Sequence, residues 1–494
     1  MDGDETVNVV SKSLTLSFVM DPLSMVMASL AVFMAASVSL YARGYAGPEE
    51  PRQRMLFILA PWAFCLFSCL AVFAGNWFLF ALFVELASLV LVFMIFFGDA
   101  RAAALYLLTQ LAGTALLLVG SAILLHQTGS AAVGPVPPKL LWYFIPALGI
   151  KAALPGLHFW LPEVHSKAPA PASALLSGFA VKLGVFGLAR LTSPETGTIY
   201  LAMGGFMTLF GVFQALLQHD AKRLLAYHTI SQLGYVISAV GTGTPLGLAA
   251  GMFHAVAHGL FKGLLFLSAG SLEKAFGSRD LRYLGGAAAL LPVTFALFAA
   301  GALAISGFPG LSGFASKALV KASLKDINNT PAVWVLQAAS VGTVISFCKL
   351  GYFAFIRKGT GSLKTLPGEG RGSVKNSHRN LGMAVAAAAT VFLGLRPDLV
   401  PGFLGEGGYP FFALSTVISA LLPIFAGLLL FILLKKALEP AEHHVPDVDN
   451  LLAATGPFLR KIPDTLGALH SGRLRVYIAY VIVAALTIFA YLER

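Results

Sequence analysis

The most informative part of this sequence is residues 141–165, which read LWYFIPALGIKAALPGLHFWLPEVH. The stretch is long and apolar enough to cross a membrane, because a span needs about 20 mostly apolar residues. Pro155 and Pro162 interrupt it, and since proline removes a backbone donor, such a break needs protein or water around it. Lys151 precedes the break, near the middle of the crossing. We therefore expect a broken transmembrane helix inside a bundle, with an ionisable group at the break.

A second broken span is expected near residues 290–325, where Gly307-Phe308-Pro309-Gly310 interrupts another apolar stretch. Uninterrupted apolar runs complete the set, near residues 22–42, 55–74, 77–97, 101–126, 171–191, 198–218, 223–241, 246–271, 331–357, 380–396, 411–437 and 474–492. Together they predict an all-α polytopic membrane protein with about 14 transmembrane crossings. Interrupted helices in two corresponding places are typical of transport pathways built from repeats.

The composition excludes several classes of protein. Of the 494 residues, 57% are hydrophobic and 12% charged, whereas a soluble globular protein carries about 25% charged residues. A water-soluble enzyme, a disordered protein and a nucleic-acid-binding protein are therefore excluded. The cysteines Cys65, Cys69 and Cys348 lie inside apolar runs and form no disulfide, metal or iron–sulfur spacing. We expect no metal and no cofactor on this chain.

The net charge of +11 carries topological information. Basic residues follow alternate spans, at Arg43, Arg52 and Arg54, at Lys222 and Arg223, at Lys274, Arg279 and Arg282, and repeatedly between Arg357 and Arg379. The positive-inside rule places these loops in the cytoplasm and both termini outside, in a multi-pass protein of the inner (cytoplasmic) membrane. The acidic, polar start MDGDETVNVV predicts no cleavable signal peptide.

The same pattern divides the chain into four parts. A short extracytoplasmic segment (1–21) precedes a membrane core (22–357). A cytoplasmic loop (358–379) then leads to further C-terminal helices (380–494), which include a polar loop at 438–473. No soluble domain is expected.

Several predicted spans carry ionisable residues, which are functional candidates because a charge at mid-bilayer costs at least about 2.5–3.5 kcal/mol. His254, His258 and Lys262 follow one another at i, i+4 and i+8, which puts them on one face of a helix about 6 Å apart. Many spans each hold one central titratable group, of alternating chemical type, as a proton relay requires. The candidates are Glu85, Lys151, Lys182, His254, His258, Lys262 and Lys317, with Lys349, His228 and His158 as further ones.

Structural interpretations of the same residues stay open. Lys182 and Lys349 could extend their amines to a membrane interface. Glu85 could be half of a purely structural ion pair. The two histidines of the stripe could be packed, uninvolved side chains, or could bind zinc or haem. No cysteine or carboxylate cluster accompanies them to complete a zinc site.

At these residues the sequence resembles the antiporter-like proton-channel subunits shared by respiratory complex I (NADH-quinone oxidoreductase), group 4 membrane-bound hydrogenases, including formate hydrogenlyase, and Mrp-type cation/proton antiporters. The resemblance runs from Asp21-Pro22-Leu23-Ser24 to about residue 357. It is strongest at residues 151–178, from Lys151 through HFWLP and EVHSKAPAPASALLSG, and continues at 220–235, 254–270 and 307–317.

The resemblance implies two inverted five-helix repeats, each with one broken helix. It makes Glu85 the membrane glutamate, Lys151 its partner and Lys182 the connecting lysine. It places the His254–Lys262 stripe at the centre of a relay and Lys317 at the release side. Two departures stand out: Val84 occupies a position that is usually Trp, and the chain begins almost at the Asp21 element, which two helices normally precede. Whether another chain supplies those helices stays open. The absence of a long lateral amphipathic helix argues against the distal subunit of complex I.

We therefore expect a proton-translocating subunit of a redox-driven complex, without a redox cofactor of its own. Its expected partners are the lipid bilayer, antiporter-like paralogues and redox subunits carrying iron–sulfur or nickel–iron centres. Protons are the expected cargo, with Na⁺ open, and no nucleic acid is expected. One alternative is a subunit of an Mrp-type antiporter without electron transfer. Others are a haem- or quinone-binding redox subunit and a scaffold with a dead channel.

Overall fold

The computed structural model describes residues 17–45, 50–358 and 374–440. The predicted crossing at 474–492, nearly all of the polar loop at 438–473, most of the loop at 358–379 and residues 1–16 lie outside this range. Within it the protein is built of helices and has no strands, only three isolated bridges between loops. The expected all-α architecture is confirmed.

Nine helices of the described residues are long and apolar enough to cross a membrane. They are α2 (Pro22–Gly44), α3 (Pro51–Val72), α4 (Trp77–Phe96), α5 (Ala100–Thr128), the continuous run of α8 (Ala170–Leu175), η2 (Leu176–Ala180) and α9 (Val181–Arg190), α10 (Pro194–Leu217), α12 (Pro245–Phe276), the run of α16 (Thr330–Gly351) and η3 (Tyr352–Ile356), and α19 (Leu414–Leu434).

Four other predicted crossings coincide with helices outside that group. These are the pair α6 (Leu141–Ala152) and α7 (Trp160–Lys167), α11 (Ala221–Val240), the pair α14 (Pro292–Ser306) and α15 (Ser312–Asp326), and α17 (Val374–Leu395). Short helices η1 (Pro138–Leu140), α13 (Ala287–Leu290) and α18 (Leu399–Phe403) connect them. Because the last predicted crossing is not described, the count of about 14 is not confirmed.

Both predicted helix breaks are present. In the first, α6 ends before Ala153 and Gly156, whose φ angles of 54° and 79° are left-handed. The indole of Trp160 donates to the Ile150 carbonyl (2.9 Å), which also accepts from the Ala153 amide (3.3 Å) at the end of α6. In the second, Gly307 (φ 87°) ends α14, and glycine suits it because other residues are strained there.

One end of the bundle, called the Asp21 end, collects residues 17–21, 73–77, 129–133 and 190–193. The Val19 amide donates to the Phe73 carbonyl (2.7 Å), which joins the start of α2 to the end of α3. Arg190, at the end of α9, forms an ion pair with Asp21 (2.6 Å). The opposite end, called the Lys222 end, collects residues 163–170, 218–222 and 277–286. There Lys222 Nζ donates to the Ala168 carbonyl (3.1 Å).

The chain order at these ends gives two units that run in opposite directions. The first unit, α3 to α9, finishes at the Asp21 end after five traverses and so begins at the opposite end. The second unit, α10 to η3, begins at the Asp21 end and finishes at Arg357, whose carbonyl accepts from the Gly286 amide (2.7 Å). Each unit contains one broken helix in fourth place, as an inverted repeat requires.

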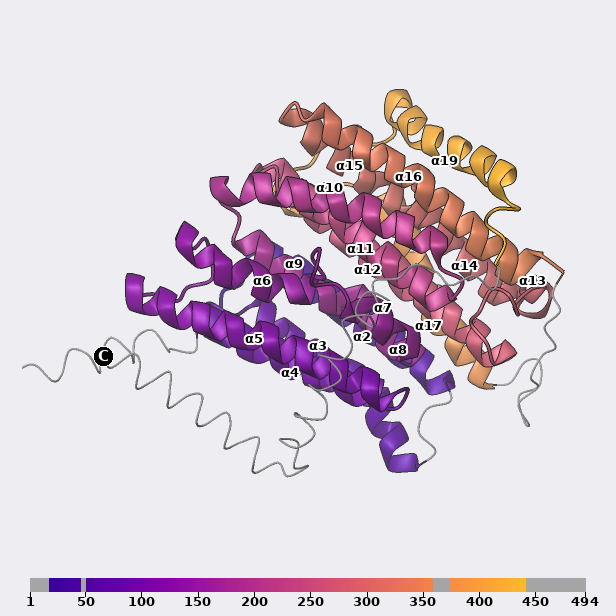
Figure 1. Cartoon of the computed structure of the whole chain (residues 1–494), viewed down its shortest axis with the longest axis horizontal. Helices are drawn as coiled ribbons and strands as arrows, with labels where there is room; N and C mark the ends of the chain where they lie inside the picture. Colours follow the sequence, from indigo (N-terminus) through magenta and orange to yellow (C-terminus); the bar gives the residue numbers. More distant parts are fainter. Residues whose placement is uncertain (1–16, 46–49, 359–373, 441–494) are drawn as a thin grey trace, which may run out of the picture.

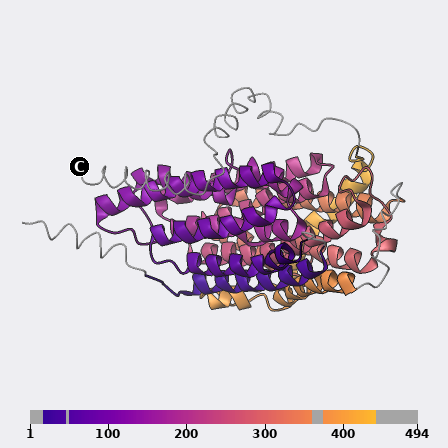
Figure 2. The same cartoon turned by 90° about the horizontal axis from the view of Figure 1, so that it is seen from below.

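The helices lie side by side, the indigo-to-purple first unit on one side and the magenta-to-orange second unit on the other (Figure 1). Seen from below, they form stacked layers of nearly parallel helices (Figure 2). Helix α12 is the central element, because it packs against α2 and α8 as well as against α11, α14 and α15. The apolar, membrane-spanning part of α12 is completely buried, so the polar side chains of this part face other parts of the protein.

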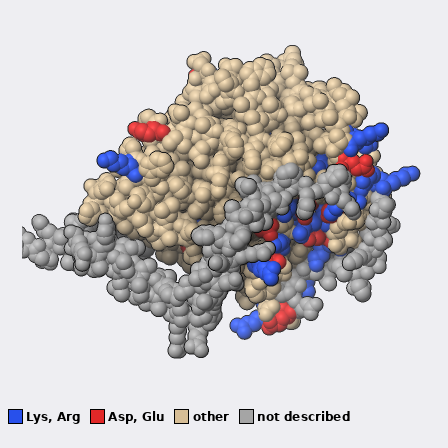
Figure 3. All heavy atoms as spheres, viewed as in Figure 1, with Lys and Arg blue, Asp and Glu red and all other residues tan. Residues whose placement is uncertain are grey.

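Charged side chains avoid the middle of the bundle surface. In Figure 3 the visible Lys, Arg, Asp and Glu gather toward one end, and a broad uncharged zone separates them from a few at the other. The Lys222 end carries the basic residues Lys167, Arg223, Lys274, Arg279 and Arg282. Such a zone is what contact with hydrocarbon requires.

Candidate functional site

The first unit holds an ion pair in its interior. Lys151, in the last turn of α6, lies with its Nζ 3.6 Å from Glu85 Oε2 of α4. Thr114 of α5 joins the two, because its hydroxyl donates to Glu85 and accepts from Lys151 (2.9 Å). The Lys151 side chain is only 2% exposed and that of Glu85 12%. The structure thus brings these two candidates into direct contact.

A small cavity adjoins this ion pair. It is lined by Lys151, Gln110, Tyr106 and Trp160 on one side and by Ala180 and Leu183, which flank Lys182, on the other. It has room for roughly one water molecule. The polar lining supplies the several hydrogen-bonding partners that a buried water needs. The cavity therefore lies between Lys151 and the helix that carries Lys182.

Lys182 follows directly on an irregular helical turn. The π-helix η2 (Leu176–Ala180) precedes α9, and the Lys182 amine donates to the carbonyl of Ser177 within that turn. π-Helical turns of this kind are frequently found at functional sites. Lys182 is fully buried, so its amine does not reach a membrane interface. The Ser177 hydroxyl contacts that of Thr229 (2.7 Å), which links this turn to α11 of the second unit.

The predicted stripe lies on the central helix α12 and is fully buried. His254 Nδ1 contacts the Ser316 hydroxyl of α15 (2.9 Å), and the Lys262 amine donates to the Leu225 carbonyl of α11. The imidazole rings of His254 and His258 are nearly parallel, with centroids 6.5 Å apart. Neither ring nitrogen of His258 has a hydrogen-bonding partner among the described residues. The stripe faces the protein interior, as predicted.

Lys317 lies on α15 just after the second break. Its amine donates to the Ile305 carbonyl (2.6 Å) in the last turn of α14 and lies 5.0 Å from the ring centroid of Tyr235. Lys317 therefore bridges the two halves of the broken helix. Its interactions are a carbonyl dipole and an aromatic face, and no carboxylate of the described ranges pairs with it.

The further candidates have different surroundings. Lys349 is 1% exposed, and its amine donates to the carbonyls of Leu216 (2.6 Å) and Gln218 (2.9 Å) at the end of α10. It caps that helix at the Lys222 end of the bundle. The His228 ring lies 4.9 Å from Phe347, and that of His158 lies 5.0 Å from Phe210. Both are aromatic packing contacts.

Three polar residues of the interior were not among the relay candidates predicted from the sequence. Thr114 bridges Glu85 and Lys151. Lys321, one turn beyond Lys317, contacts side chains of two other helices. His165 is fully buried with its ring stacked on Phe266 (4.5 Å). Lys317 and Lys321 at i and i+4 give a sequence signal, whereas Thr114 is an ordinary helix residue.

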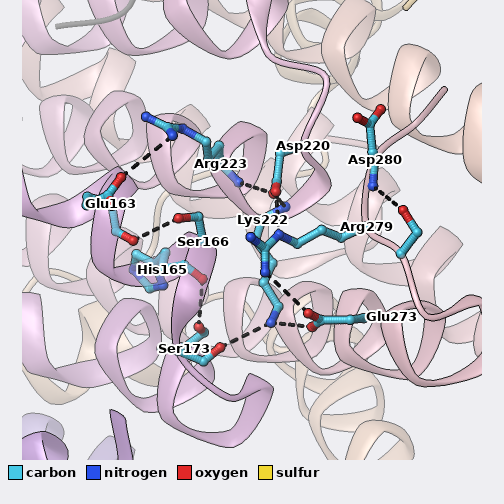
Figure 4. A network of polar contacts seen from close by, with 12 residues as sticks. Glu163, His165, Ser166, Ser173, Asp220, Lys222, Arg223, Glu273, Arg279 and Asp280 are labelled. Carbon is cyan, nitrogen blue, oxygen red and sulfur yellow. Dashed lines mark hydrogen bonds and ion pairs between the residues drawn. The ribbon is translucent and has the colours of Figure 1, made fainter. Parts of the chain in front are cut away.

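A network of charged side chains joins the two units at the Lys222 end (Figure 4). Lys222, whose side chain is 2% exposed, pairs with Glu273 of α12, and Arg279 pairs with both Glu273 (3.3 Å) and Asp220. Arg223 reaches Glu163 of α7 (3.6 Å). The second half of the first broken helix is thereby fastened to the start of α11 and the end of α12.

The Asp21–Arg190 pair has a corresponding role at the other end. Burial by itself would raise the pKa of Asp21, but the hydrogen bond and charge of Arg190 and the Ser24 amide outweigh it and lower the pKa below its ordinary value. Asp21 also caps the N-terminus of α2. No group of three His, Cys, Asp or Glu side chains in the described ranges could hold a metal ion.

Comparison with known proteins shows which family has this arrangement of helices. The profile of the NADH:quinone oxidoreductase/Mrp antiporter transmembrane family matches residues 74–346, and that of the N-terminus of chain 5 of NADH-ubiquinone oxidoreductase (complex I) matches residues 7–54. An uncharacterized Mycobacterium tuberculosis protein is 34% identical over 74% of this chain and 62% of its own length. Hydrogenase-4 component B of Escherichia coli is 30% identical, over 66% and 53% respectively.

NADH-quinone oxidoreductase subunit N of Desulforudis audaxviator is also 30% identical, over 69% of this chain and 73% of its own. The matches thus span only about half to three-quarters of these relatives.

Two solved structures share the fold. One is the membrane-bound sulfane sulfur reductase, an archaeal respiratory membrane complex, with TM-score 0.72 and 22% identity over 96% of this chain and 89% of the other. The other is the Mrp complex from Dietzia sp., with TM-score 0.71 and 23% identity over 82% and 86% respectively. The family profile covers more than half of the chain. The chain is a polytopic membrane protein that belongs to the NADH:quinone oxidoreductase/Mrp antiporter transmembrane family.

Proposed function

We propose that this chain is a proton-translocating subunit of a redox-driven membrane complex of the complex I or membrane-bound hydrogenase type. The observation that carries the proposal is a series of buried titratable side chains through the interior of both units. It begins at the Glu85–Lys151 pair and continues through Lys182 and the α12 stripe to Lys317. Burying so many ionisable groups is costly, and packing alone does not require it.

The proposed mechanism starts at the ion pair. Glu85, 3.6 Å from Lys151, stabilises the protonated lysine. A signal from a neighbouring subunit that moves Glu85 or Thr114 away removes this stabilisation. The proton then leaves Lys151 toward Lys182 by way of the small cavity beside Lys151, which Ala180 and Leu183 of the Lys182 helix also line.

The central stripe then carries the proton between the units. The Lys182 turn is linked to α11 through Ser177 and Thr229, and imidazoles have an ordinary pKa near neutrality, which suits them to pass protons on. Waters bridge the gap between the ring centroids of His254 and His258, which is 6.5 Å. The Ser316 hydroxyl on His254 connects the stripe to α15, the helix that carries Lys317.

The orientation follows from charge. The Lys222 end carries the larger share of the basic loop residues, so we place it in the cytoplasm. The Asp21 end, and with it the start of the chain, then faces outward across the cell inner membrane, and protons leave there. The last predicted crossing and the C-terminus lie outside the described residues, so the side of the C-terminus remains a prediction from the sequence.

The proposed partners are other membrane subunits, antiporter-like paralogues among them, and redox subunits carrying iron–sulfur or nickel–iron centres. The likeness to hydrogenase-4 component B and to subunit N of NADH-quinone oxidoreductase supports this assembly. The second candidate function is that of an Mrp-type antiporter subunit without electron transfer, which the Dietzia Mrp fold supports equally. Identifying the subunits that co-purify with this chain distinguishes the two.

The test is proton flux into proteoliposomes that contain the purified native complex. Lys182→Met keeps the apolar stem of a fully buried side chain and removes its amine. We expect assembled complex with flux reduced at least about tenfold, equivalent to about 1.4 kcal/mol. Lys139→Met, an exposed lysine near the Asp21 end, is the matched control and should leave flux unchanged. Full flux in an assembled Lys182→Met complex would contradict the proposal.

A further inference from the structure

Helix α15 carries three lysines on one face. Lys317, Lys321 and Lys325 follow one another at i, i+4 and i+8, about 6 Å apart along the helix. Their exposure to solvent rises along the helix: Lys317 is 5% exposed, Lys321 is half-buried and Lys325 is exposed. Since α15 runs toward the Asp21 end, the three amines lead from the second helix break to that surface.

Lys321 is held in place by two neighbouring helices. Its amine donates to the Gln337 side-chain oxygen of α16 (3.3 Å) and to the Ser419 hydroxyl of α19 (3.1 Å). The Gln337 amide in turn donates to the Ser419 carbonyl (3.2 Å), which closes the triangle. A half-buried ammonium thus has two neutral oxygen partners, and no carboxylate of the described residues pairs with it.

Helix α19 lies beyond residues 74–346, the part of the chain that the family profile matches. The hydroxyl of Ser419 on this helix nevertheless accepts a hydrogen bond from Lys321 of α15. Most residues of α19 are apolar, so the contact of Ser419 with Lys321 is one of the few polar side-chain contacts of this helix.

We propose that Lys321 is a relay residue that carries protons from Lys317 to the Asp21 end, with Gln337 and Ser419 as its positioning residues. The proposal rests on the proposed function. The transfer breaks one N–H bond on the Lys317 ammonium and forms one on the Lys321 amine, which is neutral once it has given its own proton to water.

The absence of a nearby carboxylate sets the direction of transfer. Like charges one turn apart on a helix repel, and the repulsion is stronger where the groups are shielded from water. A proton arriving on Lys317 therefore favours release of the proton from Lys321 to water at the Asp21 end, where Lys325 is exposed, and the neutral Lys321 amine then accepts the proton of Lys317. The bond of Lys317 to the Ile305 carbonyl keeps its amine at the inner end of this path.

The test measures proton flux in proteoliposomes of the native complex. We expect Lys321→Met to lower flux at least about fivefold, and Ser419→Ala, which removes one hydrogen bond, to lower it about twofold. Lys321→Arg keeps the positive charge and the hydrogen-bond donors but does not release its proton near neutral pH. It should assemble normally and transport as poorly as Lys321→Met.

Two results would overturn the inference: full flux in Lys321→Met, or full flux restored by Lys321→Arg, which would make Lys321 a fixed structural charge. If Lys321→Met fails to assemble, Lys321→Arg alone decides. Lys151→Ala is measured in parallel. When it abolishes flux while the Lys321 variants do not, the proposed function stands and this inference fails. When Lys151→Ala also transports normally, both fail.

Discussion

The two broken helices hold their lysines in opposite electrostatic surroundings. At the first break, Lys151 has a carboxylate partner in Glu85 and a shared hydroxyl in Thr114. At the second, Lys317 has only the Ile305 carbonyl and the face of Tyr235. Under the proposed mechanism this difference predicts a division of labour, in which the first unit stores a proton until its carboxylate moves and the second releases the proton that it receives.

The largest effect is expected from removing the stored charge. Lys151→Ala deletes a proton carrier and leaves Glu85 in an apolar interior without its cationic partner. We expect an assembled complex whose coupled proton flux falls to the background of empty liposomes. Lys151→Arg should fail as well, because a guanidinium keeps its proton at neutral pH. If Lys151→Arg pumps normally, the residue is a fixed charge and the storage role is wrong.

A smaller effect should follow when the first unit is made to resemble the second. Glu85→Gln keeps the size and the hydrogen bond from Thr114 but removes the charge beside Lys151. We expect flux to fall about three- to tenfold, since one pKa unit of stabilisation corresponds to about 1.4 kcal/mol. Unchanged flux at unchanged assembly would show that the carboxylate is structural and that the two breaks work alike.

The smallest effect concerns the ion pair between Asp21 and Arg190 at the Asp21 end of the bundle. The pKa of Asp21 is below its ordinary value of 3.8, so the folded protein gains stability from the Arg190 pair above that pH and loses it as pH falls through the lower folded value. Asp21→Asn keeps the helix cap. It should cost about 1 kcal/mol or less at pH 7, because the pair is partly exposed.

Thermal unfolding of the detergent-solubilised complex at several pH values checks this. The difference between wild type and Asp21→Asn should shrink below about pH 4, and proton flux at pH 7 should be unchanged. A difference that grows on acidification would contradict the assignment of the ion pair.

Much of the architecture follows from the sequence because the bilayer is so restrictive. A span must satisfy its own backbone, so the prolines and glycines at 155 and 307–310 could only mean breaks lined by protein or water. Helical periodicity likewise put His254, His258 and Lys262 on one buried face before any packing was known. The inverted order of the units is visible in the structure through contacts such as that between Asp21 and Arg190.

The contacts between helices did not follow from the sequence. Thr114 joins residues 29 and 37 positions away, and Lys321 meets Ser419 across 98 positions. Such pairs depend on how each helix is rotated about its axis and how deep it lies in the membrane. Hydrophobicity does not determine either where every face of the helix is apolar. For the same reason the sequence did not predict that the Lys349 amine donates to two carbonyls at the end of α10.

The central claim is that a titrating path connects the two units, and His258 tests it most directly because it is fully buried on the shared helix α12. His258→Gln keeps a polar side chain of similar reach but cannot carry an exchangeable charge near neutral pH. In proteoliposomes of the assembled complex we predict proton flux reduced at least about tenfold, with electron transfer by the partner subunits nearly normal where uncoupling permits it. Full proton flux in His258→Gln, and likewise in His254→Gln and Lys262→Met, would contradict the account and make the stripe a packing element.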